Sequence, residues 1–415
     1  MNINLGYGES KLGVSIADDN IGEILKVNKI QSEYDEQTLI EFAIMSPVDS
    51  SSISRKFIKG DKVVIITSDI TRPMPSYKIL PRLLAELNLA GISDADITII
   101  FGLGIHRRHS KEEQKKLVGA DIYKRLKCID SDPDDVVSLG VTSRGTPVDI
   151  FRPVVEADKR ICLGNIEYHY FAGYSGGYKA FMPGVSTFKA IQKNHSNMVK
   201  DGARAGKLKG NPVREDIEET AGFLKIDFLL NVVLDENKNI IGAYGGDPVS
   251  AHRKGCMFLD RVYSYPLEEK ADIVIVSPGG YPKDINLYQA QKALDNSKHA
   301  VKDGGIIILV AECSEGLGGE SFEKWMEDFD KPEEMVDEIQ KNFILGGHKA
   351  AAIGLILEKA QIYLVSAMKD EYVSRIFMKP FSSPQKALED ALTVLGNKVK
   401  VHVMPYGGSI LPLKK

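Results

Sequence analysis

Paired cysteines, long apolar runs and an excess of positive charge are all missing from this sequence of 415 residues. The four cysteines, Cys128, Cys162, Cys256 and Cys313, stand far apart, so neither a disulfide framework nor a zinc knuckle is expected. The longest apolar runs, such as residues 306–311, are far shorter than the ~20 residues that span a membrane. The net charge of −4 excludes the basic surface of a dedicated nucleic-acid-binding protein.

The first ten residues also lack the basic flank and the apolar segment of a signal peptide. We therefore expect a cytoplasmic protein with neither a membrane nor a nucleic acid among its partners. The composition is otherwise that of a globular protein, with 43% hydrophobic and 27% charged residues. The length predicts two or three domains, because one core rarely serves more than about 250–300 residues.

Short β-branched segments alternate with helical patterns, which predicts an α/β fold with mostly parallel sheets. Residues 62–67 and 96–101 have the continuous apolar character of buried strands, and residues 79–87 between them form an amphipathic helix. Ser110 and Glu113 form a capping box at the start of the next helix. Residues 228–244 have the pattern of a β-hairpin.

A second α/β unit follows in the C-terminal third of the chain. Strands at 272–276 and 305–311 enclose a helix at 286–300, which is the pattern of a parallel βαβ unit. We therefore predict an N-terminal domain over residues 1–268 and a C-terminal domain over residues 269–415. This prediction leaves open whether the last ~15 residues pack against the N-terminal domain instead.

Chemically useful residues follow both of the N-terminal strands, where open α/β sheets bind their ligands. Asp69, Thr71 and Arg72 come after the first strand, and the planar fork of Arg72 suits a carboxylate or a phosphate. Two glycines and His106 come after the second strand, where the glycines would let a ligand approach the backbone. The alternative is a polar turn with an Asp–Arg pair and an exposed histidine.

Residues 164–186 form the segment with the most unusual composition. It holds five glycines, several aromatic residues, His169 and Lys179. It is neither a P-loop nor a Rossmann fingerprint, because GxxxxGK[ST] and GxGxxG are both absent. A lysine with a lowered pKa in such a pocket is a candidate nucleophile. The aromatic residues make a simple glycine-rich surface loop the weaker interpretation.

Tyr288, Gln289 and Lys292 form a further candidate set on the predicted helix of the C-terminal domain. Tyr288 and Lys292 stand at i and i+4 and share one helix face. They could close a site from across an interdomain cleft, and the alternative is an ordinary solvated face.

Three histidines of the N-terminal domain, His106, His169 and His195, are candidate metal ligands. Neutral imidazole suits zinc, copper, iron and nickel, and the spacing does not follow HExxH, so the pattern names no metal. The remaining histidines are expected to be structural or exposed, and the role of His348 stays open.

Together these motifs resemble the lactate racemase family. The family fold consists of two α/β domains with the active site in the cleft between them, which agrees with the predicted pattern. The resemblance rests on residues 69–73, 102–106, 168–179, 194–195 and 288–292.

The resemblance implies a nickel-pincer nucleotide, a pyridinium-3-thioamide-5-thiocarboxylic acid mononucleotide that carries nickel on a ring carbon. Lys179 would hold it covalently through a thioamide, and His195 would be the protein ligand of the nickel. The square-planar set of two sulfurs, one carbon and one nitrogen suits Ni(II). The residues expected to line the nucleotide are Asp69, Thr71, Gly176 and Gly177.

The reaction implied is racemisation or epimerisation of a small 2-hydroxy acid by reversible hydride transfer from C2. His106 and His169 would be the paired acid/base groups, because a histidine pKa lies near working pH. Proteins that build the nucleotide and insert nickel are implied partners, and without them the protein would lack its cofactor. The residues expected to hold the substrate are Arg72, Tyr288, Gln289 and Lys292.

One departure from the family pattern concerns tryptophan. The characterised lactate enzymes use a tryptophan near the substrate, whereas the one tryptophan here, Trp325, lies outside every motif. The group on C3 of the substrate is therefore not determined. Two alternatives stay open: a non-catalytic carrier of the nucleotide, and a zinc hydrolase using the three histidines with Glu167 as its carboxylate.

Overall fold

The computed structural model describes residues 1–28 and 32–414, and its contacts divide the chain into two compact units. The larger unit comprises residues 30–261, and the smaller unit comprises residues 1–29 and 262–415. The sequence placed the start of the chain in the N-terminal domain, whereas the contacts group it with the C-terminal part. The reason is strand pairing within the smaller unit, because β3 (Ile21–Ile24) pairs in parallel with β19 (Val401–Met404).

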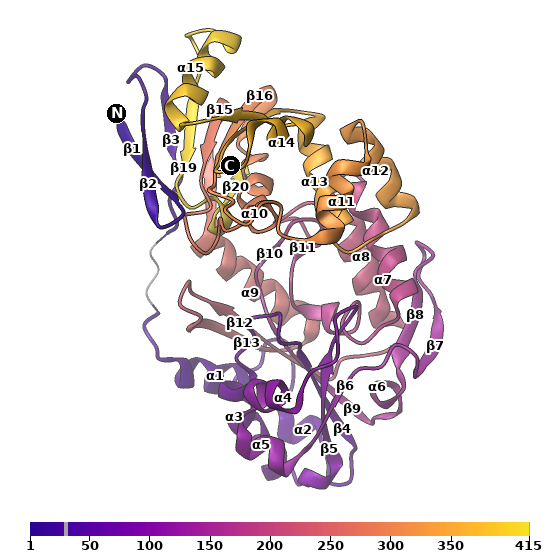
Figure 1. Cartoon of the computed structure of the whole chain (residues 1–415). Helices are drawn as coiled ribbons and strands as arrows, with labels where there is room; N and C mark the ends of the chain where they lie inside the picture. The colour runs from indigo at the N-terminus through magenta and orange to yellow at the C-terminus, as the bar shows by residue number, and fades with distance from the viewer. Residues whose placement is uncertain (29–31, 415) are drawn as a thin grey trace. The chain divides into compact units, whose positions relative to one another are not determined.

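A six-stranded sheet forms the centre of the larger unit, in the order β13-β12-β9-β4-β5-β6 (Figure 1). Every neighbouring pair is parallel except β12 with β13, which are the two strands of the predicted hairpin. The strands are β4 (Val63–Ser68), β5 (Ile97–Gly102), β6 (Lys127–Asp130), β9 (Lys159–Asn165), β12 (Phe228–Leu234) and β13 (Ile240–Gly246).

Helices and two short hairpins complete the larger unit. The predicted amphipathic helix is α3, whose five aliphatic residues are fully buried in the core of this sheet. The predicted capping box opens α4, with both reciprocal hydrogen bonds present. The helices are α1 (Glu36–Met45), α2 (Ile53–Lys56), α3 (Ser76–Leu89), α4 (Lys111–Val118), α5 (Ala120–Arg125), α6 (Arg152–Glu156), α7 (Phe188–His195), α8 (Pro212–Glu219) and α9 (Pro248–Tyr263). The hairpins are β7 (Val136–Val141) with β8 (Pro147–Phe151) and β10 (Tyr168–His169) with β11 (Gly173–Tyr174).

The smaller unit contains a second six-stranded sheet, in which all strands are parallel, in the order β18-β17-β16-β15-β19-β3. The predicted βαβ unit is β15, α10 and β16, and its buried isoleucines and valines form the core. The pair β14 (Ser264–Leu267) and β20 (Leu411–Lys414) keeps the last described residues within this unit. The remaining strands are β1 (Asn2–Tyr7), β2 (Ser10–Ser15), β15 (Ala271–Val276), β16 (Val301–Val310), β17 (Gln361–Val365) and β18 (Lys379–Phe381). The helices are α10 (Leu287–Ser297), α11 (Glu320–Asp328), α12 (Pro332–Lys341), α13 (Gly347–Leu357), α14 (Asp370–Arg375) and α15 (Pro384–Leu395).

The predicted α/β class with mostly parallel sheets is therefore confirmed. Among the described residues, no helix combines the length and the apolar character that a membrane crossing requires.

Candidate active site

The strand order of the larger unit brings three loops to one edge of its sheet. Strand β4 lies between β9 and β5, and all three run in parallel. The chain continues from β4 to β5 on one side and returns later as β9 on the other, so this is a topological switch point. Ligands of open α/β sheets bind at such points, beyond the carboxyl ends of the strands. The loops that leave there carry the predicted residues of the N-terminal domain.

Asp69 and His106 form a hydrogen-bonded pair between the loops that follow β4 and β5. The distance between Nδ1 of His106 and Oδ2 of Asp69 is 2.6 Å, and Asp69 is buried. Because an ionised carboxylate only accepts, Nδ1 carries the proton and Nε2 keeps its lone pair. Thr71 donates to Oδ1 of Asp69 over 2.9 Å and so orients the carboxylate further. The geometry is that of an imidazole oriented by a carboxylate.

A second histidine, His109, supports the loop that carries Asp69. Its Nδ1 lies 2.7 Å from Oδ1 of Asp130 at the end of β6, and its Nε2 accepts from the backbone N–H of Ile70 over 3.0 Å. The side chain of His109 is only 1% exposed. The sequence predicts His109 to be structural or exposed, and the structure shows it buried, with contacts that link three neighbouring strand ends.

Phe171 lies between the other two candidate histidines. Its ring centroid is 4.5 Å from that of His169 and 5.0 Å from that of His195, both with edge-to-face geometry. His169 comes from β10, and His195 is the last residue of α7, so Phe171 packs against two separate elements. Phe171 of residues 164–186 thus brings together two of the three histidines that the sequence offers as candidate metal ligands.

Positive charge surrounds His169. Its pKa lies well below the usual value, first because of burial and then because of the charges of Lys179, Arg72, His195 and Arg214. His169 is therefore neutral at neutral pH. These electrostatic couplings also place Arg72 and Lys179 in the neighbourhood of His169.

Lys179 lies at the other end of the same loop, in a short 3-10 turn over Gly177–Ala180. Its pKa is also well below the usual value, first because of burial and then because of Arg214 and Arg72, partly opposed by Glu167. A lysine with a lowered pKa has a substantial fraction of neutral, nucleophilic amine. Arg72 has one further contact, an ion pair of 3.9 Å with the partly exposed Glu167.

Arg214 is a residue that the sequence analysis missed. It is fully buried in α8, and its guanidinium donates to the carbonyl oxygens of Ala172, Tyr174 and Gly176. It thereby fixes the backbone between His169 and Lys179. The available signal was a charged residue next to Val213 on the buried side of α8, a helix that begins after the N-cap Asn211.

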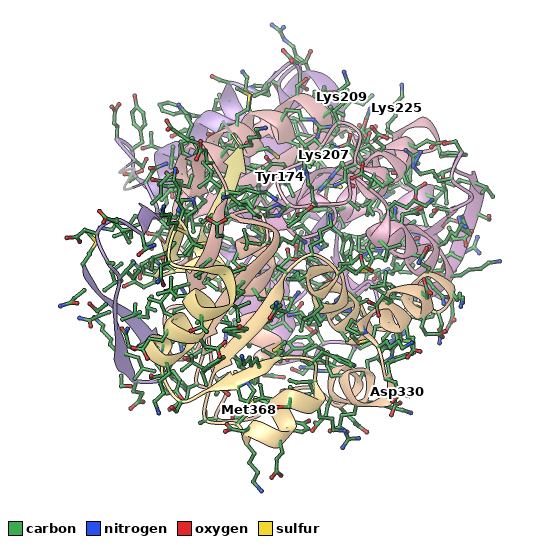
Figure 2. All side chains as sticks on the ribbon, turned by 90° about the horizontal axis from the view of Figure 1, so that it is seen from above. Tyr174, Lys207, Lys209, Lys225, Asp330 and Met368 are labelled. Carbon is green, nitrogen blue, oxygen red and sulfur yellow. The ribbon has the colours of Figure 1, made fainter. Side chains whose placement is uncertain are left out.

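Tyr174 is tied down as well, and Figure 2 labels it beside Lys207. Its hydroxyl donates to the carbonyl oxygen of Gly206 over 3.1 Å and to the carboxylate of Asp260. A Cβ on Gly173, which has φ of +78°, would come within 2.1 Å of the carbonyl oxygen of Lys207. The segment is thus closely packed and hydrogen-bonded, unlike a simple surface loop.

Gly176 and Gly177 are needed by this packing. The N–H of Gly177 donates to Oδ1 of Asn231 over 2.9 Å, and a Cβ on Gly176 would lie 2.6 Å from the same oxygen. The predicted contact of both glycines with a nucleotide stays a prediction. A similar close approach occurs at Gly102, whose nearest neighbour is the backbone of Gly184 and not an open ligand site.

The tautomer of His195 is set by a backbone hydrogen bond within α7. Its Nδ1 donates to the carbonyl oxygen of Ile191 over 2.9 Å, which leaves the lone pair on Nε2. Within residues 1–28 and 32–414 there is no group of three or more His, Cys, Asp or Glu side chains placed to hold a metal. A three-histidine zinc site therefore has no support here, whereas a single protein ligand beside a metal-carrying cofactor is compatible.

The smaller unit carries the remaining predicted residues on α10. Tyr288, Gln289 and Lys292 lie in its first two turns, and the helix begins with Asn286 as N-cap, whose side chain accepts from the N–H of Gln289 over 3.0 Å. Lys292 is exposed. Because these residues belong to the other unit, their convergence with Arg72 stays a prediction.

Trp325 and His348 have structural surroundings. Trp325 is 7% exposed in α11, and a Cβ on Gly347 would meet its ring, so the ring packs against the start of α13. His348 accepts from the N–H of Gly346 over 2.9 Å, and its pKa falls to about 3, first through burial and then through the charge of Lys349.

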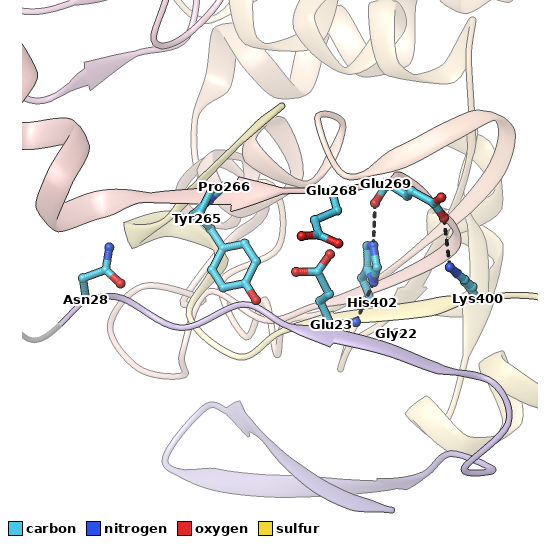
Figure 3. A pocket seen from close by; sticks show the side chains of 9 residues that line it. All are labelled: Gly22, Glu23, Asn28, Tyr265, Pro266, Glu268, Glu269, Lys400 and His402. Atoms are coloured by element: carbon cyan, nitrogen blue, oxygen red, sulfur yellow. Dashed lines mark hydrogen bonds and ion pairs between the residues drawn. The ribbon is translucent and has the colours of Figure 1, made fainter. Parts of the chain in front are cut away.

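A cavity of about 670 Å³ in the smaller unit contains none of the predicted site residues (Figure 3). His402 lies in its wall, accepts from the N–H of Glu23 over 2.8 Å and donates to the carbonyl oxygen of Glu269 over 2.9 Å. Both imidazole nitrogens are thus engaged, one with strand β3 and one with the loop between β14 and β15, as expected for a structural histidine. The lining residues are Gly22, Glu23, Asn28, Tyr265, Pro266, Glu268, Glu269, Lys400 and His402.

Comparison with known proteins finds two family matches and full-length relatives. The lactate racemase N-terminal domain matches residues 7–206, and the lactate racemase C-terminal domain matches residues 267–411. The chain is 34% identical to a lactate racemase of Thermoanaerobacterium thermosaccharolyticum over 100% of both chains. It is also 34% identical to that of Lactiplantibacillus plantarum over 99% of both.

Two solved structures are similar as well. The structure of the lactate racemase apoprotein of T. thermosaccharolyticum superimposes with a TM-score of 0.88 over 100% of both chains, at 34% identity. A Thermotoga maritima protein matches with a TM-score of 0.62 over 94% of this chain and 100% of that chain, at 17% identity, which shows a shared fold alone.

Proposed function

The chain belongs to the lactate racemase family and is a racemase, and from this premise we propose that it interconverts the enantiomers of a small 2-hydroxy acid such as lactate. The observation that carries the proposal is the grouping at the switch point of the larger unit. A carboxylate-bound histidine, His106, and a neutral histidine, His169, come from the segments that follow β5 and β9, the two strands on either side of β4. Such a pair suits a reaction that removes a proton from one enantiomer and returns it to the other.

The residues present fit the nickel-pincer nucleotide that the resemblance implies. Lys179 has the lowered pKa needed for acylation of its amine, and His195 presents Nε2 as a neutral nitrogen ligand. We propose Lys179 as the point of covalent attachment and His195 as the nickel ligand. When bound, this cofactor supplies an acceptor for the hydride at C2, which no side chain here can provide.

The side chains then supply binding and proton transfer. We propose that Arg72 pairs with the substrate carboxylate in the larger unit, and that Lys292, Tyr288 and Gln289 bind it from α10. His106 takes the hydroxyl proton at Nε2, and the imidazolium that forms is stabilised by Asp69. His169 takes the hydroxyl proton of the mirror-image substrate, and in each turnover the other histidine, in its protonated form, gives a proton to the carbonyl oxygen of the transient 2-keto acid.

The contacts of Asp69 and Thr71 suggest a different role from the nucleotide lining predicted for them. Both side chains are engaged with each other, and Asp69 is bonded to His106. We propose that Asp69 orients the imidazole and that Thr71 orients Asp69.

The experiment is co-expression with the nickel-pincer biosynthesis and nickel-insertion proteins, followed by mass spectrometry of the peptide that contains Lys179. We expect a covalent adduct at Lys179 and racemisation of at least one acid from a panel of 2-hydroxy acids. A protein with the adduct that catalyses no stereochemical exchange at C2 would be a carrier, and the proposed activity would be wrong.

A further inference from the structure

Lys349 is a buried amine in the smaller unit that none of the proposed steps uses. It comes from the first turn of α13 and is 8% exposed. Its Nζ donates to the carbonyl oxygen of Tyr288 over 2.6 Å. The same Nζ lies 3.7 Å from the centroid of the Tyr288 ring, which is the geometry of a cation–π contact. One side chain therefore holds both the backbone and the ring of Tyr288.

Other contacts restrict Tyr288 from the remaining sides. Its ring packs edge to face on Phe322 at a centroid distance of 5.7 Å, and its N–H donates to the carbonyl oxygen of Leu317 over 3.0 Å. The ring of Tyr288 thus touches both Lys349 and Phe322. Burying an amine is costly, and the contacts with the Tyr288 carbonyl oxygen and ring offset part of that cost.

Lys349 is also electrostatically coupled to Lys292, an exposed residue of α10 that lies one helical turn after Tyr288. Burial lowers the pKa of Lys349 to about 7, the charge of Lys292 lowers it further, and Asp295 opposes the shift. An anion bound at Lys292 would weaken the repulsion between the two amines. The region between Tyr288 and Lys292 therefore has two amines nearby whose mutual repulsion an anion would reduce.

We propose that Lys349 is a positioning residue that fixes Tyr288 and the adjacent Lys292 in the conformation that binds the substrate carboxylate. The inference rests on the proposed function of Tyr288 and Lys292 as carboxylate-binding residues. A residue of this kind controls the affinity for the substrate rather than the proton-transfer step, so its loss raises KM and leaves kcat nearly unchanged.

The test compares Lys349→Met with a control, Lys302→Met, in the cofactor-loaded enzyme. Lys302 is an exposed lysine of the same unit and is paired with Asp272. For Lys349→Met we expect KM for lactate to rise about tenfold, the ratio that corresponds to about 1.4 kcal/mol, with kcat within about twofold of the original enzyme. Lys302→Met should change neither constant. Lys349→Gln keeps a donor for the Tyr288 carbonyl without the charge and should give an intermediate KM.

A double-mutant cycle separates positioning from general damage. If Lys349 acts through the ring of Tyr288, substitution of Lys349 raises KM less in a Tyr288→Leu background than in the original enzyme. Trp325 packs against the start of α13 and is the one tryptophan of the chain, so its fluorescence reports whether α11 and α13 keep their packing. If Lys349→Met does not fold by this criterion, the KM of Lys349→Gln is used to test the proposal instead.

Lactate titrated into the apoprotein gives a readout that is independent of racemisation. We expect the dissociation constant for lactate to rise about tenfold in Lys349→Met and to stay unchanged in Lys302→Met. A wild-type protein that binds lactate in this pattern but racemises no acid would contradict the proposed function and support the inference. Equal lactate binding by wild type and Lys349→Met, or no binding by either, would overturn the inference, as would a fall in kcat with KM unchanged.

Discussion

His106 and His169 lie at the ends of strands two positions apart in the same sheet, yet their electrostatic surroundings are opposite. His106 is bonded through Nδ1 to the carboxylate of Asp69. His169 faces the positive charges of Lys179, Arg72 and Arg214, which together with burial hold its pKa well below the usual value. Burial and the neighbouring cations destabilise a protonated His169, whereas His106 has a carboxylate as its hydrogen-bond partner.

The difference shows that a mirror-image reaction does not require a mirror-image site. In the proposed mechanism each histidine takes the hydroxyl proton from one enantiomer and gives a proton back when that same enantiomer is formed, and the two histidines have different neighbours for the same task. The charge near His169 also depends on Lys179, because acylation of that amine removes its positive charge. Attachment of the cofactor would therefore bring the pKa of His169 closer to the working range.

The largest expected effect comes from Lys179→Ala. This variant should carry no covalent adduct and show no detectable racemisation, because the proposed attachment point is gone. In the apoprotein the pKa of His169 should rise, since the first charge that lowers it is removed, and NMR titration of the imidazole would measure this. Lys193→Ala, a change at an exposed lysine of α7, should alter neither property. An adduct that persists in Lys179→Ala would refute the attachment.

Replacing each of the two histidines separately tests whether both of them act as acid/base groups. His106→Gln and His169→Gln should each lower kcat by about 10²–10⁴-fold, which is the usual contribution of a positioned acid or base. The matched control is His299→Gln in the smaller unit, which we expect to leave kcat unchanged. Retention of more than about a tenth of the activity in either variant would show that the affected histidine is not an acid/base group.

Asp69→Asn tests the carboxylate alone. The amide keeps the shape of the side chain but loses the charge that stabilises a protonated His106, so kcat should fall about tenfold to a hundredfold. The same substitution in a His106→Gln background should have little further effect, because the two residues act as one unit. Asp132→Asn, at the half-buried partner of the exposed Arg108, is the control. Equal losses in both backgrounds would mean that Asp69 acts elsewhere.

The smallest effect concerns stability at mildly acidic pH. The folded-state pKa of His169 lies below its unfolded value, so the unfolded chain binds more protons and the protein loses stability as pH falls below about 6.5. His169→Gln lacks this contribution and should lose about 1 kcal/mol less than wild type between pH 7 and pH 5.5. Urea unfolding at the two pH values measures it. Identical losses would show that His169 is not buried as a neutral group.

Much of the local structure was predictable from the sequence, because its signals are short in range. The continuous apolar runs gave β4 and β5, the spacing of aliphatic residues gave α3, and the capping box gave the start of α4. The grouping of the first strands with the C-terminal unit was not predictable, because the pairing of β3 with β19 joins residues that are almost 380 positions apart.

The residues of the candidate site were likewise predictable where the signal is local and not predictable where it depends on distant contacts. Single motifs identified most of its residues, including Lys179 and His195, since unusual combinations of glycine, aromatic and basic residues are visible in one segment. The bond between Asp69 and His106 was missed because it connects two loops 37 positions apart. Arg214 was missed because a charge on the buried side of a helix can be recognised only when the partner carbonyl groups are known.

The sequence by itself determined the α/β class, the elements that carry the chemistry and the list of reactive side chains, since these depend on patterns within a few turns of chain. Only the tertiary structure decided which strand ends meet, because the order β9-β4-β5 results from long-range packing. The same packing decided which histidine lies against a carboxylate and which lies among cations. Proton affinity depends on neighbours in space, so the chemical difference between His106 and His169 exists only in the folded chain.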